Sequence, residues 1–368
     1  MRAPVSHVFM TTDAVGGVWT YAMDLAAGLS GHGVRTTLAV LGPPPHAEQR
    51  DMAAAVPGLS ILETGLPLEW TAPDAKTAKS AAAALGRLAR ASGADLIHLN
   101  NPALAADAAF DAPIVGLCHS DLATWWAAVR GAEPAPADFR WRTTLLRRGY
   151  AACDVLLAPT AAFASDTARV YGVRPKVIRN GRSPAARHPR PGGRDRLVLT
   201  SGRLWDEGKN VETLDRAAAR LDAPVVALGA LAGPNGQHAS LEHARPAGRV
   251  SNEEVAAALA GAPVFCSLAL YEPFGLGVLE AAQAGCALVL SDLPSFRELW
   301  NGAAVFTPAR DPEAAATILR ALLDSPEEAA RLGTAAAERA RTYTVEAMVA
   351  GVLDAYAQLL AGEAEVAA

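Results

Sequence analysis

Short runs of β-branched and apolar residues alternate with helix-like stretches along the whole 368-residue chain. This alternation is typical of parallel sheets covered by helices, because successive parallel strands need a crossover connection. In the first half, strands are predicted at residues 5–11, 36–41, 60–63, 95–99, 113–118 and 154–159. In the second half they are predicted at residues 197–201, 225–228, 264–267, 287–290 and 303–306. The pattern therefore predicts an α/β protein.

A segment rich in proline, glycine and arginine, residues 180–195, separates the two alternations. It has no apolar periodicity, which is typical of a linker between domains. We expect two doubly wound Rossmann-like domains, at residues 1–182 and 183–345, that face each other across a cleft. Ligands of such folds bind at the carboxyl ends of the parallel strands. Beyond Asp311 nearly all residues are predicted to be helical, including residues 346–368.

Composition excludes several classes of protein. Hydrophobic residues make up 51% of the chain and charged residues 19%, a globular balance rather than a disordered one. The net charge of −5 and the lack of a long basic block argue against a nucleic-acid-binding surface. The four cysteines are far apart, which argues against a disulfide framework or a zinc ribbon. No signal peptide and no run of about 18 apolar residues are found, so we expect a cytoplasmic protein without a transmembrane segment.

The strongest local motif is YEPFGLGVLEA at residues 271–281, in which seven residues separate Glu272 from Glu280. Gly275 and Gly277 open a helix and leave backbone N–H groups free, which predicts an anion site. Glu280, one turn into the helix, can accept hydrogen bonds from paired hydroxyl groups such as those of ribose. Either glutamate alone could be a solvated helix residue, but the combination favours a ligand site.

Two cations follow the first strand of the second domain, in the segment SGRLWDEGKN at residues 201–210. Arg203 and Lys209 can converge on one diphosphate, whose negative charge grows as a glycosidic bond breaks. Both could instead be solvated loop charges. Only four of the 33 basic residues are lysines, so a lysine at this position favours a function.

Three features of the first domain are candidate ligand contacts. Gly16 and Gly17 join the first strand to its helix, but the third glycine of a dinucleotide fingerprint is missing. His119 follows the strand at 113–118, and Asn100 follows the strand at 95–99 beside His98. Polar residues at such strand ends face ligands, although a lone histidine is also common as a structural residue. Asn100 is a candidate acceptor contact.

Aromatic and basic residues follow His119. Trp125 and Trp126 could form an aromatic wall for a sugar acceptor, or could simply pack in the core. Residues 140–148 begin a basic helix that could contact an anionic membrane or acceptor, and a solvated helix face is the alternative. The basic residues are Arg140, Arg142, Arg147 and Arg148.

These segments, in this order, resemble the retaining GT-B glycosyltransferases, and most closely glycosyltransferase family 4. The resemblance covers nearly the whole chain and implies the GT-B fold, in which the C-terminal helix crosses back to the first domain. It implies catalytic roles for His119, Arg203, Lys209 and Glu272. It implies donor-binding roles for Gly16, Gly17, Ser251, Phe274, Gly275, Leu276, Gly277 and Glu280.

The resemblance also implies the reaction, which is transfer of a hexose from a nucleotide diphosphate sugar to a hydroxyl acceptor with retained configuration. UDP is the default nucleotide because it is the commonest among relatives. No D-x-D occurs in the chain, so we expect no metal and no cofactor, with arginine and lysine in place of the cation. The acceptor is a glycan, a glycolipid or a small molecule, and peripheral contact with the inner face of a membrane is compatible with this.

Two alternatives use the same architecture. A nucleotide-sugar 2-epimerase would need paired histidines and acids in the cleft and no separate acceptor. A non-catalytic nucleotide-sugar-binding protein would have lost one or more charged site residues, whereas all are present here. The spacing of the two glutamates together with Arg203 and Lys209 favours transfer.

Overall fold

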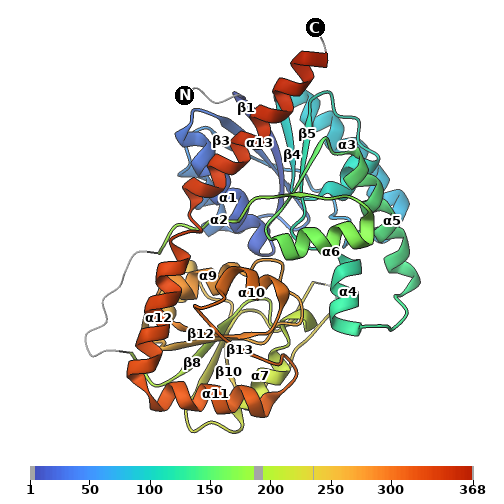
Figure 1. Cartoon of the computed structure of the whole chain (residues 1–368). Helices are drawn as coiled ribbons and strands as arrows, with labels where there is room; N and C mark the ends of the chain where they lie inside the picture. Colours follow the sequence, from blue (N-terminus) through green and yellow to red (C-terminus); the bar gives the residue numbers. More distant parts are fainter. Residues whose placement is uncertain (1–4, 186–193, 235, 367–368) are drawn as a thin grey trace. The chain divides into compact units, whose positions relative to one another are not determined.

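The computed structural model describes residues 5–185, 194–234 and 236–366. The chain divides into two compact units: unit 1 comprises Met1–Gly181 and Val345–Ala368, and unit 2 comprises Arg182–Thr344. Each unit is a parallel sheet with helices on both faces (Figure 1). The expected α/β fold with two Rossmann-like domains is confirmed. Most of the expected linker, residues 186–193, lies outside the described residues.

Unit 1 is built on a seven-stranded parallel sheet of order β3-β2-β1-β4-β5-β6-β7. Its strands are β1 (His7–Asp13), β2 (Arg35–Leu41), β3 (Leu59–Glu63), β4 (Leu96–Leu99), β5 (Ile114–Leu117), β6 (Val155–Ala158) and β7 (Lys176–Val177). Its helices are α1 (Gly17–Gly31), α2 (Ala47–Ala54), α3 (Ala75–Ser92), η1 (Pro102–Ala106), α4 (Leu122–Arg130), α5 (Ala137–Ala152), α6 (Ala161–Tyr171) and α13 (Val345–Val366).

Unit 2 is built on a six-stranded parallel sheet of order β10-β9-β8-β11-β12-β13. Its strands are β8 (Val198–Ser201), β9 (Val225–Leu228), β10 (Arg245–Gly248), β11 (Val264–Ser267), β12 (Ala287–Ser291) and β13 (Val305–Thr307). Its helices are η2 (Glu207–Lys209), α7 (Val211–Ala218), α8 (Asn252–Gly261), α9 (Leu276–Gln283), α10 (Pro294–Trp300), α11 (Pro312–Asp324) and α12 (Pro326–Ala340).

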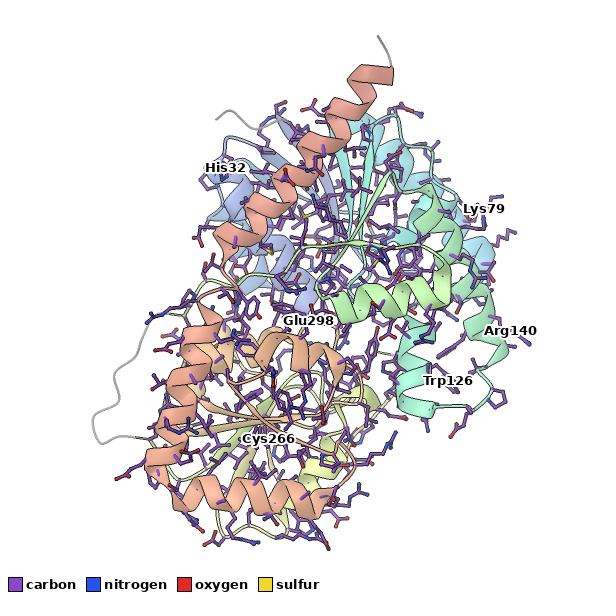
Figure 2. The ribbon with its side chains drawn as sticks, viewed as in Figure 1. His32, Lys79, Trp126, Arg140, Cys266 and Glu298 are labelled. Atoms are coloured by element: carbon purple, nitrogen blue, oxygen red, sulfur yellow. The ribbon has the colours of Figure 1, made fainter. Side chains whose placement is uncertain are left out.

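Burial and capping explain why these segments fold as they do. All seven residues of β1 are buried, as expected for a central parallel strand covered on both faces. α3 begins where the Asp74 carboxylate accepts a hydrogen bond from the Thr77 amide, and it ends at Gly93, whose φ of 64° suits glycine. In unit 2, residues of β11 and β12 such as Cys266 lie in the core (Figure 2).

Two strands were not predicted from the sequence. β7 has only two residues, Lys176 and Val177, and both are exposed. β10 reads RPAG, with no β-branched or aromatic residue, and it lies at the edge of its sheet, where a proline is tolerated. Both are edge strands whose pairing depends on the neighbouring strand, so the local sequence carries no signal for them.

The C-terminal helix α13 belongs to unit 1, where it lies beside α1 (Figure 1). The unit boundaries differ by one residue from those expected at 182 and 345. Met348, Val352 and Tyr356 of α13 are buried in the same core as Leu25 of α1. The Tyr356 hydroxyl lies 2.7 Å from Nδ1 of His98 on β4, in a fully buried contact. The last helix therefore completes the core of the first unit.

One helical stretch within the described residues, Pro326–Gly362, is long and apolar enough to cross a membrane by length and composition. No such stretch was expected from the sequence. It includes α12 and most of α13, which residues 341–344 separate. Met348 and Val352 lie in the core of unit 1, and core helices also pass this test. The stretch is weak support for a membrane span.

We expect Tyr356→Phe to destabilise unit 1 by about 1–3 kcal/mol, because His98 would lose its buried hydrogen-bond partner. Thermal unfolding followed by circular dichroism should show a fall in Tm of about 2–4 °C for each kcal/mol. Gln358→Ala, at an exposed position of the same helix, should leave the Tm unchanged. An unchanged Tm in Tyr356→Phe would show that α13 is not anchored through this contact.

Candidate active site

In unit 2, the loop after β8 carries Lys209 on a rigid backbone. Asp206 caps η2 by accepting a hydrogen bond from the Gly208 amide at 2.9 Å. Asn210 has a φ of 51°, and its side-chain amide donates to the carbonyl oxygens of Leu268 and Ala309 at 2.8 and 2.7 Å. The backbone is thus fixed on both sides of Lys209, which limits the positions that its ammonium group can reach.

Lys209 forms an ion pair with Glu272, the first glutamate of the E-x7-E motif. The two side chains are 22% and 14% exposed, so the pair is mostly buried but still reachable from solvent. The Gly208 carbonyl accepts hydrogen bonds from the amides of Leu270 and Tyr271 at 2.8 and 3.3 Å. The loops that carry Lys209 and Glu272 are therefore joined through both backbone and side chains.

The start of α9 is open to an anion. Gly275 caps the helix with a φ of 89°, no side chain caps its N–H groups, and its first turn contains no acidic residue. A Cβ at Gly277 would lie 2.9 Å from Oγ of Ser201, so glycine permits the close approach of α9 to the end of β8. A helix N-terminus with unpaired N–H groups attracts phosphate. An anion-binding role for Gly275, Leu276 and Gly277 stays a prediction.

Glu280, the second glutamate of the motif, is paired with Arg182, a residue that the sequence analysis missed. Arg182 Nε donates to Glu280 Oε1 at 2.8 Å, and Gln283 Nε2 donates to the Arg182 carbonyl at 2.7 Å. The two paired side chains are 16% and 26% exposed. Arg182 lies in the segment that was expected to be a linker, and the composition of that segment did not suggest a site. The pair fixes the orientation of the Glu280 carboxylate.

Three other predicted residues of unit 2 have structural partners. Arg203 pairs with Asp206 at 3.2 Å and lies over the Trp205 ring, while its side chain stays 40% exposed. Phe274 is buried edge-on against Tyr343, so only its backbone could contact a donor. Ser251 caps α8 by accepting a hydrogen bond from the Glu254 amide. These partners give the three residues local structural roles, and their donor contacts stay predictions.

In unit 1, a hydrogen-bonded chain fixes His119 at the end of β5. The Asn100 side-chain amide donates to the Thr11 carbonyl at 2.8 Å, which points its Oδ1 towards His119. Nε2 of His119 lies 2.8 Å from that oxygen. Because Oδ1 can only accept, Nε2 carries the proton and Nδ1 keeps its lone pair. Asn100, the candidate acceptor contact, therefore positions His119 in this structure.

Burial keeps His119 neutral. Desolvation and then the neighbouring His98 lower the pKa of His119 to about 3. The Tyr21 ring meets it edge-on at 4.8 Å between centroids. Cys118, the adjacent residue, is fully buried, and burial raises the pKa of its thiol well above the usual range. A Cys–His nucleophile pair is therefore excluded, and His119 is suited to hydrogen bonding rather than to charge.

The glycine loop lies between β1 and α1. Gly16 is the N-cap of α1, and as a glycine it has no side chain that could cap the first turn. Asp13, at the end of β1, accepts a hydrogen bond from the Val15 amide at 2.8 Å and fixes the turn that leads to Gly16 and Gly17. A donor-binding role for Gly16 and Gly17 at this helix start stays a prediction.

The two tryptophans of α4 pack locally. Trp126, labelled in Figure 2, donates from Nε1 to the Glu133 carbonyl at 2.7 Å and meets Phe139 edge-on. Trp125 lies against Trp126, with 6.3 Å between ring centroids. Both side chains are partly exposed. Trp126 therefore holds α4 against the segment that precedes α5, and an acceptor-binding role for either ring stays a prediction.

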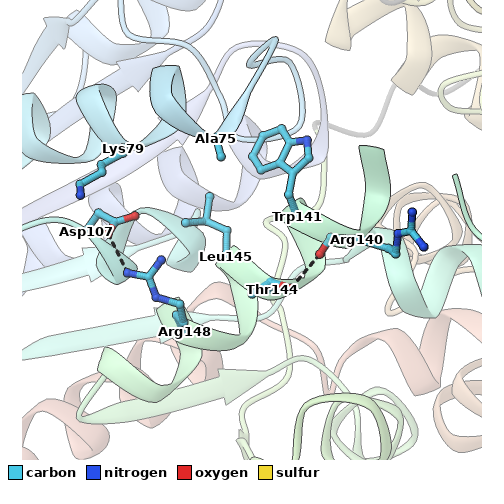
Figure 3. Close-up of a pocket in the computed structure, with 8 residues that line it drawn as sticks. All are labelled: Ala75, Lys79, Asp107, Arg140, Trp141, Thr144, Leu145 and Arg148. Atoms are coloured by element: carbon cyan, nitrogen blue, oxygen red, sulfur yellow. Dashed lines mark hydrogen bonds and ion pairs between the residues drawn. The ribbon is translucent and has the colours of Figure 1, made fainter. Parts of the chain in front are cut away.

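The basic segment at residues 140–148 does not form a continuous basic face. Arg142 is buried and donates to the carbonyls of Glu69 and Ala72, and Arg147 donates to the Val170 carbonyl. Arg148 pairs with Asp107, whereas Arg140 points away from them (Figure 3). A cavity of about 480 Å³ lies there, lined by Ala75, Lys79, Asp107, Arg140, Trp141, Thr144, Leu145 and Arg148. The segment is mainly structural.

Sequence reasoning also missed Glu69, which lies in the loop between β3 and α3. Its carboxylate accepts a hydrogen bond from the Asn101 amide at 3.5 Å. Burial, and then the Asp13 carboxylate, raises the pKa of Glu69 to about 7. A charged residue in the apolar segment GLPLEW was the available signal. Among the described residues, no group of three or more histidine, cysteine or acidic side chains could hold a metal ion.

Two sequence profiles match the chain: Glycosyltransferase Family 4 at residues 15–185 and Glycosyl transferases group 1 at residues 185–339. The chain is 29% identical over 345 residues to MMP alpha-(1->4)-mannosyltransferase from Mycolicibacterium hassiacum, covering 83% of this chain and 82% of that one. It is 31% identical over 275 residues to glycogen synthase from Mycobacterium tuberculosis, covering 67% and 64% respectively.

Solved structures share the fold. Sucrose-phosphate synthase from Thermosynechococcus elongatus superposes with a TM-score of 0.78 and 18% identity, covering 97% of this chain and 100% of that one. HepE from Anabaena, in complex with UDP and glucose, has a TM-score of 0.72 and 16% identity, covering 96% and 100%. The two matching profiles together with the shared fold identify a GT-B glycosyltransferase. The chain belongs to the group formed by glycosyltransferase family 4 and glycosyl transferases group 1.

We expect ¹⁵N NMR of histidine-labelled protein to show His119 neutral, with its proton on Nε2, from about pH 5.5 to pH 8. The reason is that burial lowers its pKa and Asn100 can only accept from it. His119→Asn would assign the signal, and Asn100→Ala should release the preference for Nε2. A ring that titrates near its ordinary pKa, or carries its proton on Nδ1, would contradict this geometry.

Proposed function

We propose that the protein transfers a hexosyl group from a nucleoside diphosphate sugar, with UDP as the default nucleotide, to a hydroxyl acceptor with retained configuration. The observation that carries this proposal is the grouping of the Lys209–Glu272 ion pair with the open start of α9. An ammonium group and free helix N–H groups match a diphosphate, and a carboxylate matches sugar hydroxyls.

The proposed transfer step uses the positive charge of Lys209 and the amides at the start of α9. When the glycosidic bond breaks, its electron pair goes to the β-phosphate oxygen, so negative charge develops there. Lys209 and the amides of Gly275 to Gly277 would stabilise that charge, and Arg203 is exposed enough to join them. The acceptor oxygen then forms the new bond on the face that the phosphate leaves, and the departing phosphate oxygen takes the acceptor proton. No protein nucleophile is needed.

The remaining site residues would position the donor. Glu272 would accept hydrogen bonds from the sugar hydroxyls, and Glu280, held by Arg182, would accept them from the ribose. Nδ1 of His119 would accept one from a sugar hydroxyl, because its lone pair is fixed by the bond from Nε2 to Asn100. Within their own units, Arg182 orients Glu280 and Asn100 orients His119, so each of these two side chains needs little local rearrangement on binding.

The comparisons support the donor and acceptor classes. HepE was solved with UDP and glucose, while the two named relatives are a mannosyltransferase and a glycogen synthase. We therefore propose a glucosyl or mannosyl donor and a carbohydrate hydroxyl acceptor. We further propose metal-independent action in the cytoplasm, with the cations of the β8 loop in the place of a metal ion. Addition of EDTA should then leave turnover unchanged.

We expect Lys209→Met to weaken binding of UDP about tenfold to a hundredfold, because a charge-assisted contact to phosphate is lost. Isothermal titration with UDP, GDP and ADP, together with slow hydrolysis of UDP-glucose, GDP-mannose and ADP-glucose, would measure this and identify the nucleotide. The control is Lys76→Met, on α3 of unit 1, with Tm measured for each variant. Wild-type protein that binds none of the nucleotides would contradict the proposed function.

A second prediction concerns Glu280. We expect wild-type protein to bind UDP about tenfold more tightly than 2′-deoxy-UDP, because one charge-assisted hydrogen bond to the ribose would be lost. Glu280→Gln should reduce this difference, whereas Glu338→Gln, at an exposed position of α12, should preserve it. If Glu280→Gln discriminates as well as the wild type, Glu280 does not contact the ribose.

A further inference from the structure

The loop that carries Glu69 is fixed in place within unit 1 by burial and hydrogen bonds. Leu68 is fully buried in the core, and its carbonyl accepts hydrogen bonds from the amides of Thr71 and Ala72 at 3.1 and 2.8 Å. The buried guanidinium of Arg142 donates to the carbonyls of Glu69 and Ala72 at 3.1 and 2.7 Å. Arg142 thus stabilises the backbone of this loop through hydrogen bonds. These bonds fix the position of the Glu69 Cα atom.

The carboxyl group of Glu69 lies at the same edge of the sheet as His119. Asn101, which donates to it at 3.5 Å, follows Asn100, the partner of His119. Both asparagines follow β4, which pairs with β1 and β5, so the carboxyl ends of these neighbouring strands meet here. Asp13, the last residue of β1, is close enough to raise the pKa of Glu69. Glu69 therefore lies with His119 among the polar residues at the carboxyl ends of β1, β4 and β5.

Asn101 leaves a buried hydrogen-bond acceptor at this edge. Asn101 is only 6% exposed, and its buried Oδ1 has no hydrogen-bond partner among the residues that the structure describes. The Glu69 carboxyl group accepts from the side-chain amide of the same asparagine, and Asp13 is close enough to Glu69 to raise its pKa. The charged group that faces these carboxyl groups from α5 is Arg142, which is itself paired with Asp138. An unpaired buried acceptor is costly, and a ligand that donates hydrogen bonds would remove that cost.

We propose that Glu69 and Asn101 form an acceptor-binding subsite that takes hydrogen bonds from the hydroxyl groups of a polyhydroxylated acceptor. This inference rests on the proposed function, because it assigns the residues that would hold the second substrate. A hydroxyl group supplies a donor for Asn101 Oδ1, and adjacent hydroxyls of one sugar can reach a carboxylate and an amide oxygen together. Glu69 is thereby an acceptor-specificity residue.

The state of Glu69 sets the pH dependence of this binding. With a pKa of about 7, its carboxyl group is protonated at pH 5 and ionised at pH 8. The ionised form accepts hydrogen bonds more strongly, so acceptor affinity should rise with pH through neutrality. The fold favours the protonated form, so stability should fall as pH rises from about 4.5 to about 7. Glu69→Gln should therefore gain in Tm, relative to wild type, at pH 8 but not at pH 4.5.

The test compares wild type, Glu69→Gln and the control Glu63→Gln, which removes an exposed carboxylate on β3. Saturation-transfer NMR measures binding of two probes, maltotriose and methyl α-D-mannopyranoside, without donor. We expect at least one probe to bind the wild type and the control, with affinity rising from pH 6 to pH 8. Glu69→Gln should bind it about tenfold more weakly at pH 8, through loss of a charge-assisted hydrogen bond.

A second measurement separates this inference from the proposed function. With UDP-glucose and the same probes, the ratio of transfer to donor hydrolysis should fall about tenfold in Glu69→Gln, mainly through a higher KM for the acceptor. Absence of any turnover in wild type would count against the proposed function. Failure of both probes to bind wild type, or equal binding by wild type and Glu69→Gln with no pH dependence, would overturn the role of Glu69.

Discussion

The ion pair between Lys209 and Glu272 joins the two loops on which the candidate donor site depends. Each loop is fixed separately, by Asn210 on one side and by the bond from Ser295 to the Glu272 carbonyl on the other. Because both side chains are mostly buried, removing either one would leave the other charge partly desolvated and without this partner. The pair therefore keeps an ammonium group and a carboxylate ready beside the open start of α9.

The two units present different kinds of side chain at their candidate ligand-binding edges. Both place polar groups at the carboxyl ends of parallel strands, where the backbone of the next helix begins. Unit 2 gathers charges in pairs, so a charged ligand can exchange partners with them. Unit 1 orients the neutral His119 through Asn100 and, among the described residues, leaves Asn101 Oδ1 without a partner. The first arrangement suits a diphosphate, and the second suits hydroxyl groups.

The sequence predicted those strands and helix starts that depend on residues close together along the chain. Residues 225–228 and 264–267 were expected as strands and form β9 and β11, and the E-x7-E motif located the start of α9. Glu69 was not found, because Asp13 and Asn101 approach it from other strands. The arginines of α5 looked alike in sequence, yet Arg142 is buried and Arg140 is not, since partners from distant loops decide their roles.

The most direct test of the account is a crystal structure of the protein with a bound nucleoside diphosphate. We predict that the β-phosphate contacts Lys209 Nζ and the amides at the start of α9, with the ribose hydroxyls on Glu280. In that structure Lys209 would share its ammonium group between the phosphate and Glu272. A nucleotide bound away from α9, or a Lys209–Glu272 pair that no phosphate touches, would contradict the account.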